Sequence, residues 1–76
     1  MVPQFTLAGD VRRGRRPDYT AAEAPSNAEV LFQRCCERIR EETSLEVQSC
    51  AFGARMQVEL VNEGPVTILM DSRRQF

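Results

Sequence analysis

Apolar residues recur at the spacing of one helical face between positions 26 and 44. They are Ala28, Leu31, Phe32, Cys35 and Ile39. Ser26 with Glu29 fits a capping box, in which each side chain satisfies a free backbone amide of the first turn. The pattern predicts a helix that begins at Ser26 and ends near Thr43 or Ser44. Its apolar face is expected to pack in a core, the alternative being a surface for a partner.

Strand-like alternation follows in the C-terminal third of the chain. From Arg55, the apolar side chains Met56, Val58 and Leu60 alternate with polar ones. A turn at 62–65 contains adjacent Gly and Pro, and alternation resumes over 66–71. This pattern predicts an antiparallel hairpin with one buried face.

Two weaker patterns complete the expected fold. Residues 2–7 alternate weakly and predict the end of a strand, whereas 45–50 predict a short strand or an extended connection. Phe52-Gly53-Ala54 indicates a turn or bulge. The fold class predicted is α+β, an antiparallel β-sheet with one packed helix. Because a strand begins almost at Met1 with nothing before it to pair with, the sheet is expected to continue in a second subunit or in residues outside this chain.

Length and charge limit the classes of function. The 76 residues suffice for one small domain, and a net charge of −1 argues against a globally basic nucleic-acid binder. All ten basic residues are Arg, however, and four of them lie within 12–16. They belong to a predicted loop, residues 8–25, that is long enough to suspect a function. The loop is expected either to contact phosphate through the planar Arg fork or to be a solvated surface, and the residues favour neither.

The Cys and His content excludes several chemistries. Three Cys, an odd number, make no disulfide framework, and Cys35, Cys36 and Cys50 are expected to be buried small hydrophobes in a reducing compartment. The absence of His removes the usual general base, and no zinc site or other cofactor is predicted. No apolar run approaches the ~20 residues of a membrane span, so a cytoplasmic protein with no membrane partner is expected.

Four motifs in order carry a resemblance to a known family. They are Gln4-Phe5-Thr6-Leu7 with Gly9-Asp10; Arg13-Gly14-Arg15-Arg16-Pro17; Phe52-Gly53-Ala54 with Met56-Gln57-Val58; and Asn62-Glu63-Gly64-Pro65-Val66-Thr67. From Val2 to about Ser72 the chain resembles the C-terminal half of the D-aminoacyl-tRNA deacylases, also called D-tyrosyl-tRNA deacylases. The resemblance implies that residues 1–76 are a single partial domain of a barrel-like sheet in a homodimer. A truncated product, a mis-set start codon or a partial gene model is expected.

The resemblance also implies a reaction and a set of site residues. Family members hydrolyse the ester that joins a D-amino acid, or glycine, to the 3′ end of tRNA, which is a chiral proofreading activity. On this chain Gln4, Phe5 and Thr6 would line the catalytic pocket. Gly64 and Pro65, joined by a cis bond, would be the selectivity filter that reaches into the other subunit. The tRNA-binding residues would be Arg12, Arg13, Arg15 and Arg16. Backbone amides would hold the oxyanion, and a tRNA hydroxyl would assist water.

Plainer interpretations stand beside these roles. Thr6 would otherwise be a strand residue chosen for β-propensity, and Gly64-Pro65 a simple hairpin turn. The chain also departs from the family, since Pro3 replaces the usual Ser and Glu63 the usual Asp. Pro3 leaves the stereochemical preference open. The alternative function is a catalytically inactive fragment that acts only as a dimerising or RNA-binding module.

Overall fold

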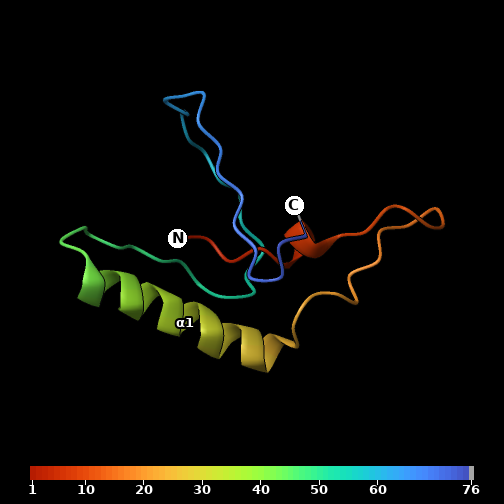
Figure 1. Cartoon of the computed structure of the whole chain (residues 1–76), viewed down its shortest axis with the longest axis horizontal. Coiled ribbons are helices and arrows are strands. Elements are labelled where there is room, and N and C mark those ends of the chain that lie inside the picture. The colour runs from red at the N-terminus through yellow and green to blue at the C-terminus, as the bar shows by residue number, and fades with distance from the viewer. Residues whose placement is uncertain (76) are drawn as a thin grey trace.

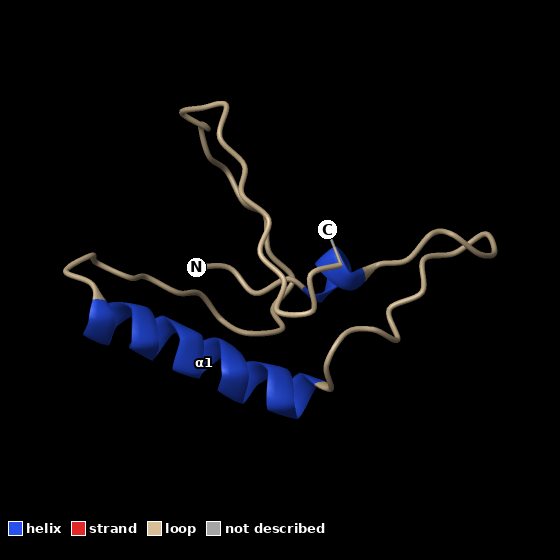
Figure 2. Cartoon of the chain, viewed as in Figure 1, coloured by secondary structure: helices blue, strands red, loops and turns tan. Residues whose placement is uncertain are grey.

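The computed structural model describes residues 1–75, which contain two helices joined to long loops (Figures 1 and 2). A single 3-10 turn, η1, spans Phe5–Ala8, and the long helix α1 spans Pro25–Glu42. Neither helix within residues 1–75 has the length and apolar character needed to cross a membrane. An isolated bridge between Asp10 and Asp18 is the only strand-type pairing in this range. The predicted antiparallel sheet is therefore wrong, whereas the predicted helix is confirmed.

The ends of α1 are fixed differently from the sequence prediction. Pro25 occupies the first helical position, where its fixed φ suits the helix and its missing N–H costs no hydrogen bond. The preceding Ala24 makes no side-chain cap, and Ser26 lies inside the helix, so the predicted capping box is wrong. The C-terminal boundary is close to the prediction. There the Thr43 hydroxyl donates to the carbonyl of Ile39 at 2.7 Å and closes the last turn.

The covered face of α1 is displaced from the predicted one. Cys36 is the one buried residue within residues 1–75, at 3% exposure, and Ala28 and Phe32 lie partly covered on the same face. Cys35 and Leu31, which were expected on the core face, are exposed. The interpretation of Cys35 as a buried small hydrophobe is therefore wrong. Successive residues are about 100° apart around a helix, so Cys35 and Cys36 point in different directions. The segments that pack against α1 decide which of the two is covered.

The segment after α1 returns along the helix as an extended connection (Figure 1). It forms no strand, and Arg40 ties it to the helix through hydrogen bonds from Nη2 and Nε to the carbonyl of Val47, at 2.8 and 3.2 Å. Cys50 at its end is exposed, contrary to the expectation of burial. The predicted turn at Phe52-Gly53 is confirmed, with Gly53 at φ +72°, a conformation that Gly adopts without strain.

Residues 54–70 form an arm that rises away from α1 and turns back near its tip (Figure 1). No backbone hydrogen bond links the arm to any of residues 1–75, so its alternating segments make no ladder. A strand needs a partner backbone at hydrogen-bonding distance, whereas a helix satisfies its own backbone. This difference explains why the hairpin prediction is wrong. The arm is apolar and exposed at Met56, Val58, Leu60, Val61, Val66, Ile68, Leu69 and Met70.

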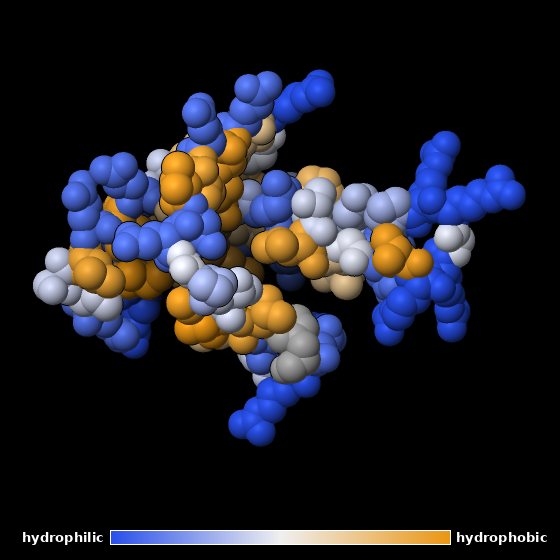
Figure 3. Space-filling view, turned by 90° about the horizontal axis from the view of Figure 1, so that it is seen from above, coloured by the Kyte–Doolittle hydropathy of each residue, from blue (hydrophilic) through white to orange (hydrophobic). Residues whose placement is uncertain are grey.

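The N-terminal segment also differs from its prediction. Residues 2–7 were expected to end a strand, but the chain coils into η1. The amide of Leu7 donates to the carbonyl of Gln4 at 3.3 Å, and that of Gly9 donates to Thr6 at 3.0 Å. In the space-filling view, apolar surface reaches solvent between the charged side chains (Figure 3). The described chain therefore has very little core of its own.

Candidate functional site

An open groove of about 1210 Å³ lies between η1, the start of α1 and the turn at Phe52-Gly53. Most of its lining is apolar or aromatic, with Gln4, Glu23 and Arg55 as the polar side chains. Two of the three predicted catalytic residues, Gln4 and Phe5, line this groove, and Thr6 does not. A groove of this composition can hold an apolar or aromatic group and orient it with few polar contacts.

Aromatic contacts shape both sides of the groove. Phe5 meets Tyr19 edge to face, with ring centroids 5.1 Å apart and an interplanar angle of 71°. On the other side Phe32 of α1 lies 6.2 Å from Phe52. Such pairs stabilise the approach of two segments beyond the area they bury. Tyr19 was not singled out by sequence, because an isolated aromatic residue in a loop gives no periodic signal.

Gly9 permits the close approach of η1 to Tyr19. A Cβ placed on Gly9 would lie 3.0 Å from the carbonyl oxygen of Thr6 and 3.1 Å from Cε1 of Tyr19. Both contacts are tighter than ordinary van der Waals distances. A larger residue at this position would push Tyr19 away and widen the groove beside Phe5.

Thr6 is exposed, and its backbone is more engaged than its side chain. Its carbonyl accepts the hydrogen bond from Gly9, whereas its hydroxyl makes none to residues 1–75. The amides of Phe5 and Thr6 likewise donate to no acceptor in this part of the chain. The site therefore offers backbone N–H donors rather than an activated side-chain nucleophile.

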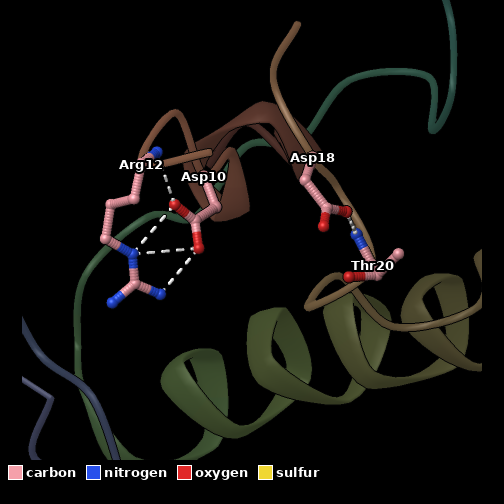
Figure 4. Close-up of polar contacts among 4 residues, drawn as sticks. All are labelled: Asp10, Arg12, Asp18 and Thr20. Atoms are coloured by element: carbon pink, nitrogen blue, oxygen red, sulfur yellow. Dashed lines mark hydrogen bonds and ion pairs between the residues drawn. The ribbon is translucent and has the colours of Figure 1, made fainter. Parts of the chain in front are cut away.

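The Arg cluster lies in a loop closed by two backbone hydrogen bonds. The amides of Asp10 and Asp18 each donate to the other's carbonyl at 2.8 Å, which brings the two ends of segment 11–17 together. The Asp18 carboxylate accepts from the amide of Thr20 at 2.8 Å, which restrains the segment that leaves the loop (Figure 4). Gly14 sits within the loop at φ +74°, in the left-handed region.

Arg12 is ion-paired within this loop (Figure 4). Its Nε donates to both carboxylate oxygens of Asp10, at 2.9 and 3.1 Å, and its Nη2 donates at 2.6 Å. These hydrogen bonds, with one from the Arg12 amide, lower the pKa of Asp10 from 3.8 to about 2. The same contact raises the pKa of Arg12. The charge of Arg12 is thus largely balanced. This pair was not predicted from the sequence, although an Asp two residues before an Arg could have suggested it.

The other three predicted tRNA-binding residues differ from Arg12. Arg13, Arg15 and Arg16 are exposed and form no ion pair with any residue from 1 to 75. Three guanidinium groups therefore face solvent from one short loop. This arrangement suits an anionic partner, because each planar fork can bind phosphate through two donors.

The predicted filter residues lie in the arm. The Gly64–Pro65 peptide bond is cis. A Cβ on Gly64 would lie 2.8 Å from the amide nitrogen of Val66 and 3.0 Å from Nδ2 of Asn62, so only Gly fits the observed backbone. The arm carries this turn away from η1 and from the Arg loop, as we call segment 11–17 (Figure 1). Within one chain the structure does not bring the filter residues to the groove.

Within residues 1–75, no three Cys, Asp or Glu side chains gather closely enough to hold a metal ion. Two cysteines each contact a methionine sulfur. Cys36 Sγ lies 3.7 Å from Sδ of Met1, and Cys50 Sγ lies 3.8 Å from Sδ of Met56. Sequence reasoning missed both contacts, because the residues share no spacing motif.

Comparison with known proteins gives one consistent result. A family model described as D-Tyr-tRNA(Tyr) deacylase matches residues 1–71. The chain is 49% identical over 76 residues to the D-aminoacyl-tRNA deacylase of Thermosipho melanesiensis, covering 100% of this chain and 51% of that protein. It is 53% identical over 76 residues to the protein of the same name from Anaeromyxobacter dehalogenans, covering all of this chain and 50% of that protein.

A third relative extends the same result. The D-aminoacyl-tRNA deacylase of Symbiobacterium thermophilum is 55% identical over 75 residues, with 99% of this chain and 49% of that protein covered. The chain therefore spans about half the length of the curated relatives it matches.

Proposed function

Because the chain belongs to the D-Tyr-tRNA(Tyr) deacylase family, we propose that it takes part in the hydrolysis of D-aminoacyl-tRNA. The bond cleaved is the ester between a D-amino acid and the 3′ end of the tRNA, and the products are the free amino acid and tRNA. The observation that carries the proposal is the similarity of the whole chain to proteins with this activity in their names. Glycine on a mischarged tRNA is a second proposed substrate, and the cytoplasm is the proposed location.

The groove beside η1 is the proposed pocket for the aminoacyl group. Gln4 and Phe5 line it, and Tyr19 holds Phe5 in place by edge-to-face contact. We assign the catalytic role of Thr6 to its backbone, because the amides of Phe5 and Thr6 are unengaged among residues 1–75. Amides that point at the oxygen of the ester carbonyl would stabilise the negative charge that develops there during hydrolysis. The tRNA hydroxyl beside the ester would assist water, since the chain has no His.

Gly64 and Pro65 are the proposed filter against L-amino acids. Their turn has no room for a Cβ, so its backbone shape depends on Gly64. The arm holds this turn away from η1, which lines the groove of its own chain (Figure 1). The proposal therefore includes a homodimer, in which the turn of one copy enters the groove of the other.

The Arg loop is the proposed contact for tRNA phosphates. Arg13, Arg15 and Arg16 carry unbalanced charge within the described chain, whereas Arg12 is held by Asp10. The same loop supports the second candidate function, an RNA-binding module without turnover. The very small hydrophobic core favours that alternative, since Cys36 is the one buried residue within residues 1–75.

A deacylation assay tests the proposal. The chain is incubated with tRNA charged with D-tyrosine or with L-tyrosine, and the remaining ester is measured over time. We expect release of D-tyrosine and survival of the L-ester. In Gly64→Ala the added Cβ displaces the turn, and we expect the D-ester rate to fall roughly 10–100-fold, as a misplacement of about 1 Å can cause.

The matched control is Val61→Ala in the same arm, where the side chain is 97% exposed. This variant should retain the rate and the preference of the unaltered chain. Equal hydrolysis of both esters would contradict the stereochemical assignment. Binding of tRNA without hydrolysis would favour the RNA-binding module. The absence of both hydrolysis and tRNA binding would contradict both candidate functions.

A further inference from the structure

A smaller cavity of about 410 Å³ lies where the two ends of the Arg loop meet. It is lined by Asp10, Arg12, Arg13 and Asp18, and it shares no lining residue with the groove beside η1. Its volume falls within the range of about 300–1,000 Å³ that is usual for small-ligand sites. Because all four lining residues are charged, we refer to this cavity as the charged pocket.

Backbone pairing fixes the two acidic residues of the charged pocket. Asp10 and Asp18 stand directly opposite each other in an antiparallel bridge and exchange two hydrogen bonds of 2.8 Å. Residues that are directly opposite in such a pair place their side chains on the same face. The two carboxylates accordingly point the same way in Figure 4. The closure of the loop therefore holds both carboxylates at one site.

The four side chains differ in how far they are already engaged. Both carboxylate oxygens of Asp10 accept hydrogen bonds from Arg12, at 2.6–3.1 Å. Asp18 accepts from the amide of Thr20 through Oδ1, and its Oδ2 accepts no hydrogen bond from residues 1–75. Arg13 forms no ion pair in this part of the chain. The charged pocket thus presents one guanidinium group and one carboxylate oxygen to a ligand.

We propose that the charged pocket binds one unpaired nucleotide of RNA, with its phosphate on Arg13 and an amino group of its base on Asp18. The guanidinium fork binds phosphate through two donors, and a carboxylate accepts from the N4 amino group of cytosine. Uracil has an oxygen at the same ring position, which a carboxylate repels. The inference rests on the proposed function, in which tRNA supplies the nucleotide, and it makes Asp18 the residue that discriminates between bases.

The neighbouring arginines favour a strand over a free nucleotide. Arg15 and Arg16 are exposed in the same loop and form no ion pair with residues 1–75. A free nucleotide would leave them without an anion, whereas a strand supplies a phosphate at every nucleotide. Base edges are open to side chains in single-stranded RNA. The partner is therefore an unpaired strand.

Binding of two RNA octamers tests the inference. Fluorescein-labelled oligocytidine and oligouridine, which have the same number of phosphates, are titrated with the chain at one fixed salt concentration and followed by fluorescence anisotropy. We expect oligocytidine to bind about fivefold more tightly, at the low end for a base contact because Asp18 is exposed. In Asp18→Asn the preference should disappear, because an amide can donate to uracil as well as accept from cytosine.

The matched control is Glu59→Gln, which removes one negative charge from an exposed position in the arm. It should retain the fivefold preference, and circular dichroism at 222 nm would verify that each variant retains α1. Unlabelled 5′-CMP should compete with oligocytidine at least roughly tenfold less well than the unlabelled octamer does, because it supplies a single phosphate.

Three results would overturn the inference: no binding of either octamer, equal binding of the two, or a preference that persists in Asp18→Asn. Competition by 5′-CMP as effective as that by the octamer would overturn the assignment to a strand. None of these measurements involves an ester. A chain that prefers oligocytidine but leaves D-tyrosyl-tRNA intact would contradict the proposed hydrolysis alone, and hydrolysis without the preference would contradict the charged pocket alone.

Discussion

Helix α1 and the arm of residues 54–70 have clear periodic patterns, yet only the helix forms regular structure. The helix satisfies its backbone through hydrogen bonds between residues four apart. The arm makes no backbone hydrogen bond within residues 1–75 and exposes its apolar side chains. The difference shows that a helical pattern predicts a segment whose backbone groups bond to one another. An alternating pattern predicts only which side chains share a face, and the strand still needs a second backbone to pair with.

Proline substitution should separate the two regions most strongly. In α1, Arg34→Pro removes a hydrogen bond in the helix interior and should cost about 3 kcal/mol, with loss of most of the 222 nm circular dichroism signal. In the arm, Glu59→Pro should leave that signal unchanged, because there is no ladder to interrupt. A comparable loss in Glu59→Pro would show that the arm is hydrogen-bonded in solution.

Truncating one apolar side chain in each region should give a smaller difference, measured as the change in the free energy of unfolding. Phe32→Ala removes a partly covered ring that faces Phe52, and should lower the free energy of unfolding by roughly 1–2 kcal/mol, less than a fully buried Phe would. Ile68→Ala in the arm should change it by no more than about 0.5 kcal/mol, because that side chain is 78% exposed. Urea titration followed at 222 nm measures both, and a larger cost at Ile68 would contradict the exposed arm.

The Arg loop gives the smallest and most local effect. The folded pKa of Asp10 is about 2 against an ordinary 3.8, so its contact with Arg12 is favourable above pH 3.8 and is lost as the pH falls toward 2. An NMR titration of the Asp10 carboxyl carbon should have its midpoint near 2. In Arg12→Gln the midpoint should move back toward 3.8, and a midpoint near 3.8 in the unaltered chain would show that the pair does not form.

Local interactions account for what the sequence predicted well. The extent of α1 follows from its periodicity, and the turn at Phe52-Gly53 follows from the conformational freedom of Gly. The face of α1 could not be fixed in this way, since Cys36 rather than Cys35 is covered by segments distant in sequence. Residues 2–7 show the same limit, because weak alternation did not reveal that the chain coils into η1.

The candidate site was predicted unevenly for similar reasons. Motif order pointed to Gln4 and Phe5, which line the groove, but also to Thr6, which does not. Whether a side chain faces a groove depends on the turn that carries it, and η1 was not foreseen. The contact between Phe5 and Tyr19 joins two segments that no spacing rule connects.

The Asp10–Arg12 pair changes how the loop would respond to salt. Each phosphate neutralised on a single strand releases counterions, and the logarithm of the association constant falls with that of the salt concentration by about 0.7 per contact. With Arg12 already compensated, the contacts available are those of Arg13, Arg15 and Arg16. Binding of the unpaired 3′ end of a tRNA to this loop should therefore show a slope of about 2, and Asp10→Asn should steepen it to about 3.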